Sequence, residues 1–125
     1  MNAHDRLALV ILAVEDLPRA LAFYRQAFDW EQAVDVPVYA EFRIPGGMRF
    51  GINAGQEPQA IVPGGVTATE LYFYPRDLGV TMRRVEAAGA RRLKPLARKD
   101  WGDEAAYYAD PDGNVVVLAR PLRAP

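Results

Sequence analysis

The chain has 125 residues, half of them hydrophobic, and carries 15 Lys and Arg against 16 Asp and Glu, for a net charge of −1. This length fits one domain that can bury a core without covalent staples, and the absence of cysteine excludes disulfides and thiolate chemistry. The balanced charge lacks the basic excess that binding to a phosphate backbone needs, so nucleic acid is not an expected partner. An apolar run at residues 7–14 is too short to span a membrane, and we therefore expect a soluble, cytoplasmic protein.

The first predicted elements are a strand and a helix. Residues 7–14, LALVILAV, form the nearly continuous apolar run that is typical of a strand covered on both faces, so a central place in a sheet is expected. Asp16 then supplies a side-chain acceptor for the free N–H groups of a helix start. Apolar residues recur at helical spacing after it, which predicts a helix over residues 17–28.

The segment at residues 30–53 indicates further strands. One is predicted at residues 36–44 and another at residues 48–53, joined by a tight turn at Gly46-Gly47. Residues 55–65 are rich in Gly, Pro and Gln without periodicity, which predicts a linker.

The same order of elements then starts again. A strand is predicted at residues 69–74, Asp77 is a second helix cap, and a helix follows over residues 78–88. The region 101–118 predicts a hairpin around the turn Asp110-Pro111-Asp112-Gly113-Asn114. Because Asp77 follows Asp16 by 61 positions, we infer an internal repeat. The single domain then has one module at about residues 5–54 and a second at about residues 66–122.

Several motifs carry a resemblance to a known family. They are VEDLPRALAFY at residues 14–24, Asp77-Leu78, AAGA at residues 87–90, Trp101-Gly102 and the turn at residues 110–114. With them the chain resembles the vicinal oxygen chelate superfamily, which includes glyoxalase I, bleomycin resistance proteins and extradiol dioxygenases. The resemblance implies an α+β fold in which two βαβββ modules form a cupped mixed β-sheet with the helices on its convex side. It also implies a ligand crevice on the concave face and a homodimer.

The resemblance further implies four positions for metal ligands, one on the first and last strand of each module. These positions carry Leu9, Gly51, Glu70 and Val117, and only Glu70 has a donor atom in its side chain. One carboxylate falls short of the three or four protein ligands that a catalytic zinc site uses, so neither a metal nor another cofactor is expected. His4, the single histidine, precedes the first strand and is expected to be solvated.

Alternation along the strand at residues 69–74 places Glu70, Tyr72 and Tyr74 on one face. The concave face is then predicted to form a ligand-binding pocket, with Glu70 as its one buried charge and walls made by Leu9, Tyr72, Tyr74, Trp101, Val115 and Val117. Such a pocket suits a largely apolar ligand with a cationic or hydrogen-bonding group. The alternative is that the tyrosines serve ordinary sheet packing and that a neighbouring group satisfies Glu70.

Three functions remain open, and no catalytic residue is identified. The sequence has no nucleophile beside a base, no phosphate-binding loop and no paired carboxylates at a fixed spacing. This favours metal-free binding or sequestration of a small amphipathic molecule, as the likeness to bleomycin resistance proteins suggests. The alternatives are a metal-dependent lyase similar to lactoylglutathione lyase, an isomerase or a dioxygenase with an altered site, and a module for binding a partner protein.

Overall fold

The fold consists of two successive βαβββ units. A computed structural model describes residues 7–54 and 70–122; the predicted linker at residues 55–65 and His4 lie outside the described residues. The first unit comprises β1 (Leu9–Ala13), α1 (Leu17–Ala27), β2 (Glu31–Val36), β3 (Tyr39–Arg43) and β4 (Arg49–Asn53). The second comprises β5 (Glu70–Phe73), α2 (Leu78–Ala87), β6 (Arg91–Arg98), β7 (Asp103–Ala109) and β8 (Val115–Pro121). This order confirms the α+β repeat, since both β5 and α2 begin 61 positions after their counterparts β1 and α1.

Both helices begin at the predicted caps. An Asp16 carboxylate oxygen accepts a hydrogen bond from the Arg19 backbone N–H at 3.0 Å, and Asp77 accepts one from the Val80 N–H at 3.1 Å. Each cap satisfies one of the N–H groups that a helix start leaves without a partner.

The prediction of one strand over residues 36–44 is wrong about where that strand begins. Val36 ends β2 and pairs with Tyr39, the first residue of β3, across a two-residue connection. Pro37 lies in this connection, where its missing N–H is no loss to the ladder. The apolar character of Val36 and Val38 concealed the turn from the sequence.

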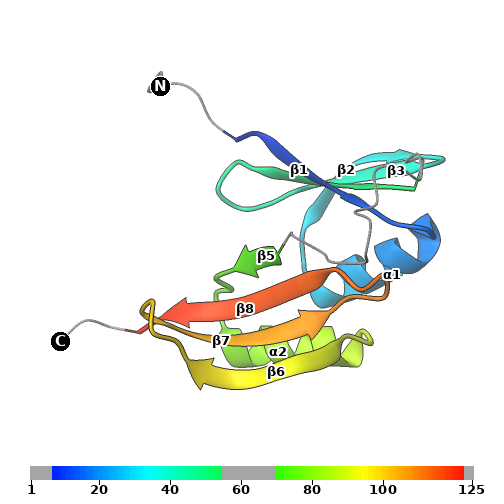
Figure 1. Cartoon of the computed structure of the whole chain (residues 1–125). Helices are drawn as coiled ribbons and strands as arrows, with labels where there is room; N and C mark the ends of the chain where they lie inside the picture. The colour runs from blue at the N-terminus through cyan, green and yellow to red at the C-terminus, as the bar shows by residue number, and fades with distance from the viewer. Residues whose placement is uncertain (1–6, 55–69, 123–125) are drawn as a thin grey trace, which may run out of the picture.

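The strands form two four-stranded mixed sheets, in the orders β1-β4-β3-β2 and β5-β8-β7-β6 (Figure 1). One hydrophobic core joins both helices to one side of each sheet. The opposite sides point outward. We call them the first outer face, which contains Ile11, Glu41 and Gly51, and the second outer face, which contains Tyr72, Tyr107 and Val117. Within the described residues of one chain the two sheets therefore stay separate and do not close into one cup.

The position of β1 corrects a second expectation. Among the described strands β1 lies at the edge of its sheet, with β4 as its one neighbour, and is not central. Leu12 is buried toward the core, whereas Ile11 is 46% exposed on the first outer face. The apolar run therefore corresponds to a strand, β1, with two apolar sides. The described residues of the chain cover the side of Leu12 and leave Ile11 on the other side exposed.

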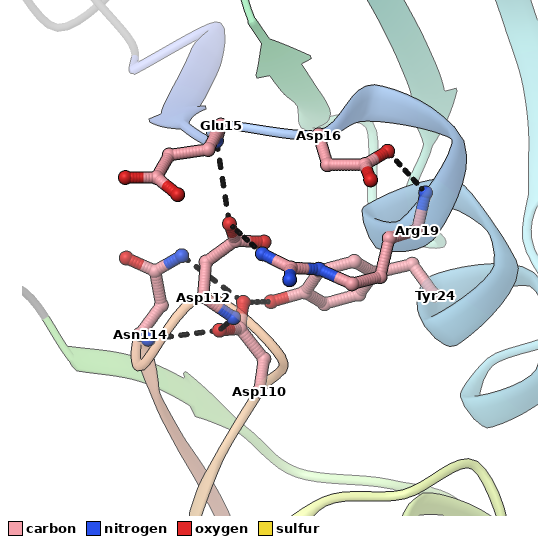
Figure 2. Close-up of polar contacts among 7 residues, drawn as sticks. All are labelled: Glu15, Asp16, Arg19, Tyr24, Asp110, Asp112 and Asn114. Carbon is pink, nitrogen blue, oxygen red and sulfur yellow. Dashed lines mark hydrogen bonds and ion pairs between the residues drawn. The ribbon is translucent and has the colours of Figure 1, made fainter.

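The turn at Asp110–Asn114 ties the second unit to α1 of the first (Figure 2). Asp110 accepts hydrogen bonds from the N–H groups of Asp112 and Asn114, and Tyr24 of α1 donates its hydroxyl proton to the same carboxylate at 2.6 Å. Burial, reinforced by Asp110, raises the pKa of Tyr24 well above its usual value. Arg19 of α1 pairs with Asp112 at 2.9 Å. The turn of the second unit is thus bonded directly to α1 of the first unit.

Across the described parts of the chain, neither helix has the length or apolar character needed to cross a membrane.

Candidate functional site

Three aromatic residues predicted to line a pocket lie on the second outer face. Tyr72 belongs to β5, Tyr74 follows it directly, and Trp101 lies in the turn before β7. Their side chains are 39%, 60% and 57% exposed, respectively. Large apolar surfaces that gather at one place on a protein mark a site that contacts another molecule.

Asp103, the first residue of β7, joins these aromatic side chains. It is only 6% exposed. The Tyr72 hydroxyl donates to its Oδ2 at 2.5 Å, and the Tyr74 hydroxyl donates to the same oxygen at 3.0 Å. The indole Nε1–H of Trp101 donates in turn to the Tyr72 hydroxyl oxygen at 3.0 Å. We call these four residues the Asp103 cluster.

Hydrogen bonding fixes where the protons of the Asp103 cluster lie. Burial and then the bond to Asp103 raise the pKa of Tyr72, and the bond to Asp103, followed by burial, raises the pKa of Tyr74. Both phenols are therefore protonated at neutral pH, and both protons are directed at the carboxylate. The side chains of the cluster present oxygen lone pairs and ring faces outward, and no free donor.

The floor beneath the cluster is made of small and apolar side chains, namely Ala105, Tyr107, Val117 and Ala119. Tyr72 reaches from β5 to β7 with β8 in between, so its side chain crosses this floor. Val117, a predicted site residue, is fully buried there. The ammonium groups of Lys94 and Lys99 lie 4.9 and 5.3 Å from the centre of the Tyr107 ring. The ring of Tyr107 on this face thus already has two cations of the chain close to it.

Glu70 does not have the predicted burial. It is exposed, and its side chain forms no hydrogen bond or ion pair with the part of the chain that the structure describes. It lines a cavity of about 300 Å³ between β1, β4 and β5, together with Leu7, Arg49 and Tyr72 among others. The prediction is wrong for a single chain because β5 is an edge strand, with no neighbour among the described residues on its outer side. Leu9 lies half-buried on β1, in the other sheet.

A second cluster, which the sequence did not reveal, lies on the first outer face. The Tyr39 hydroxyl donates to Glu41 Oε1 at 2.6 Å, and Arg49 Nη1 donates to Glu41 Oε2 at 3.0 Å. Glu41 is 5% exposed. Burial and the bond to Glu41 raise the pKa of Tyr39 to about 12. We call these residues, with Gly51 beneath the Tyr39 ring, the Glu41 cluster.

Comparison with known proteins identifies the family. A sequence profile described as "Glyoxalase/Bleomycin resistance protein/Dioxygenase superfamily" matches residues 6–118, nearly the whole chain. The chain belongs to this superfamily. The profile confirms the resemblance inferred from the motifs.

Relatives of the chain share its fold, and some share close to a third of its sequence. Uncharacterized proteins of Mycobacterium bovis and Mycobacterium tuberculosis are 31% identical over 126 residues, which is 90% of this chain and 81% and 72% of those proteins. A solved glyoxalase-related enzyme of Fulvimarina pelagi is 26% identical with a TM-score of 0.75, over 91% of this chain and 86% of its own. A lactoylglutathione lyase of Agrobacterium tumefaciens has a TM-score of 0.70 at 22% identity, over 94% and 95% of the two chains, and thus shares the fold.

The residues at the superfamily's four metal-ligand positions do not fit a metal. Leu9 and Gly51 lie on the first sheet, Glu70 and Val117 on the second, and only Glu70 has a side-chain donor. A Cβ atom placed on Gly51 would stand 2.5 Å from the Tyr39 hydroxyl oxygen, so the phenol takes the space into which a longer side chain would project. Within residues 7–54 and 70–122, no three His, Asp or Glu side chains come together in a way that suits a metal ion.

Proposed function

We propose that this protein binds or sequesters a small amphipathic molecule on the second outer face without the help of a metal. The observation that carries the proposal is the Asp103 cluster, in which two exposed tyrosines bond one buried carboxylate and an exposed tryptophan bonds one of these tyrosines. Ligand sites combine apolar walls with a few converging polar groups, and this cluster has that composition. The lack of cysteine supports a reducing cytoplasm as the place of this function.

We further propose that a second copy of the chain completes the site. Two apolar side chains here are well exposed, namely Leu7, which precedes β1, at 67% and Ile11 of β1 at 46%. Both β1 and β5 are edge strands with no neighbour on one side in the described chain. Exposed apolar edges of this kind favour association. A homodimer that places the first outer face of one chain against the second outer face of another would enclose both clusters.

Metal content separates this proposal from the alternative of a metal-dependent lyase, isomerase or dioxygenase. Purified protein should contain no stoichiometric nickel, zinc, iron or manganese by elemental analysis, because three of the four family ligand positions lack donors. One equivalent of any of these metals per chain would overturn metal-free binding. Sedimentation equilibrium should show a dimer that dissociates on dilution, and a monomer at all concentrations would reject the composite site.

A further inference from the structure

The hydrogen-bonding capacity of the Asp103 cluster is used unevenly. The hydroxyl protons of Tyr72 and Tyr74 both go to Asp103, and the Trp101 N–H goes to Tyr72. Every side-chain donor of the cluster is therefore committed within it, while lone pairs on both phenol oxygens remain. A ligand that meets the cluster has to bring the donors or the positive charge itself.

The charge of Asp103 is also balanced less well than that of the other buried acidic residues. Glu41 has the guanidinium of Arg49. Asp110 accepts two backbone N–H groups, in addition to side-chain donors. Asp103 accepts from two neutral phenols and forms no ion pair within the described residues. A buried carboxylate with so few compensating groups is costly for a protein to keep, which favours a role toward a partner of opposite charge.

The aromatic rings also differ in whether a cation of the chain lies near them. Lys94 and Lys99 lie over the ring of Tyr107, and Arg92 lies 5.8 Å from the ring centre of Tyr108. The three rings of the Asp103 cluster carry no cation from the described part of the chain, although they are the exposed ones. Faces of Tyr and Trp rings attract ammonium groups, most strongly where water is partly excluded.

We propose that the Asp103 cluster is a cage for an organic cation, namely a protonated or quaternary amine attached to an apolar group. This inference rests on the proposed function and names the chemical class of its ligand. The positive charge lies near the Asp103 carboxylate and against the rings of Tyr74 and Trp101, and the apolar group lies on the remaining outer face. An anion of the same size meets a buried negative charge and finds no free side-chain donor within the cluster, because the Lys94 and Lys99 ammonium groups of this face lie over the ring of Tyr107 instead.

Three probes that share a phenyl ring test the charge preference directly: benzyltrimethylammonium, benzyl alcohol and benzoate. Their affinities are measured by quenching of Trp101 fluorescence, and only the signal that disappears in Trp101→Phe is counted. We expect benzyltrimethylammonium to bind at least about tenfold more tightly than the other two, in line with a cation over several rings beside a carboxylate.

Variants then connect the preference to the cluster. Asp103→Asn should reduce the affinity for benzyltrimethylammonium about tenfold and leave that for benzyl alcohol unchanged. Tyr74→Leu changes a surface side chain, which keeps the test valid if Asp103→Asn fails to fold, and should weaken the cation several-fold. Glu86→Gln is the matched control. Its carboxylate also accepts from a phenol, Tyr108, but on the helix side of the sheet, so no affinity should change.

The outcomes separate the two proposals. If benzyltrimethylammonium and benzyl alcohol bind equally well, or if Asp103→Asn and Tyr74→Leu both leave the preference intact, the cation cage is wrong and binding on the second outer face stands. If none of the three probes quenches Trp101, the proposed function itself fails, together with this inference.

Discussion

Both outer faces contain a buried carboxylate that accepts a hydrogen bond from tyrosine, but they differ in whether a cation neutralises that carboxylate. On the first, Tyr39 donates to buried Glu41, and Arg49 neutralises that carboxylate. On the second, tyrosines donate to buried Asp103, and no cation of the described chain pairs with it. The first face balances its carboxylate with a cation of its own, whereas within the described residues the second face does not. In our proposal the phenol–carboxylate pair is structural in the first half of the repeat and serves ligand binding in the second.

The comparison extends to the residues beneath the tyrosines. Tyr39 lies over Gly51, and Tyr72 crosses a floor that contains Ala105 and Ala119. Small residues make room for a ring in both cases. Gly51 therefore has a packing role at a position where the superfamily implies a metal ligand.

Restoring a ligand at Gly51 should produce the largest effect. Gly51→Glu brings a Cβ within 2.5 Å of the Tyr39 hydroxyl, so the tyrosine has to leave its place over the sheet. We expect a loss of about 3 kcal/mol in the free energy of unfolding, the upper end of the range for overpacking. Urea denaturation measures this loss, and elemental analysis should find no metal gained.

Gly79→Ala is the control for this substitution. A Cβ at this position in α2 would have ordinary contacts, the nearest at 3.5 Å. Replacing a helical glycine by alanine should stabilise the protein by about 0.5–1 kcal/mol. If Gly51→Glu were as harmless as Gly79→Ala, Tyr39 would not be held over Gly51, and the packing explanation would be lost.

Removing the cation from the first face would make it resemble the second. Arg49→Met leaves Glu41 buried with Tyr39 as its remaining side-chain partner. Loss of one partner of a buried ion pair is costly, but water screens Arg49, whose side chain is 48% exposed. We expect a loss of about 1–2 kcal/mol in urea denaturation.

Arg43→Met is the matched control, on the neighbouring strand of the same sheet. Its ion pair with Glu31 joins two side chains that are 62% and 70% exposed, so its removal should cost less than about 1 kcal/mol. Equal losses for the two variants would show that the burial of Glu41 does not matter to its pair.

The sequence predicted those features that depend on local chemistry. Asp16 and Asp77 cap helices because a carboxylate three residues before a backbone N–H can reach it. Alternation correctly brought Tyr72 and Tyr74 to one face, because the side-chain period of a strand is two. These features need no knowledge of distant partners.

The features that the sequence missed depend on strand register. Asp103 meets Tyr72 only because β5, β8 and β7 lie side by side with one particular alignment. Glu41 meets Arg49 for the same reason in the other sheet. The prediction that β1 is central failed because an apolar run does not distinguish a strand inside a sheet from an apolar strand at the edge of one.

The pH dependence of stability sharpens the view of the first face. The pKa of Tyr39 is about 12 in the folded protein, against about 10 in an unfolded chain. Its protonated form therefore contributes stability that is complete below about pH 10 and is lost as the pH rises toward 12. The difference in unfolding free energy between the wild type and Tyr39→Phe should shrink between about pH 10 and pH 12. A difference that stays constant over this interval would mean that burial and the bond to Glu41 do not raise the pKa of Tyr39 in the folded protein.

The last prediction is that the removal of divalent ions has no effect on Tm. A metal would link the two outer faces, since its family positions include Leu9 and Gly51 on one sheet and Glu70 and Val117 on the other. A ligand present at a hundred times its Kd stabilises a protein by about 2.7 kcal/mol, which at this chain length amounts to roughly 10 °C in Tm. Dialysis against EDTA should leave Tm unchanged, and so should adding zinc back. A fall of several degrees that zinc reverses would show that the folded protein binds a metal ion, and the proposal of metal-free binding would be wrong. An unchanged Tm would agree with the proposed metal-free binding, in which the carboxylate of Asp103 and not a metal ion meets the ligand.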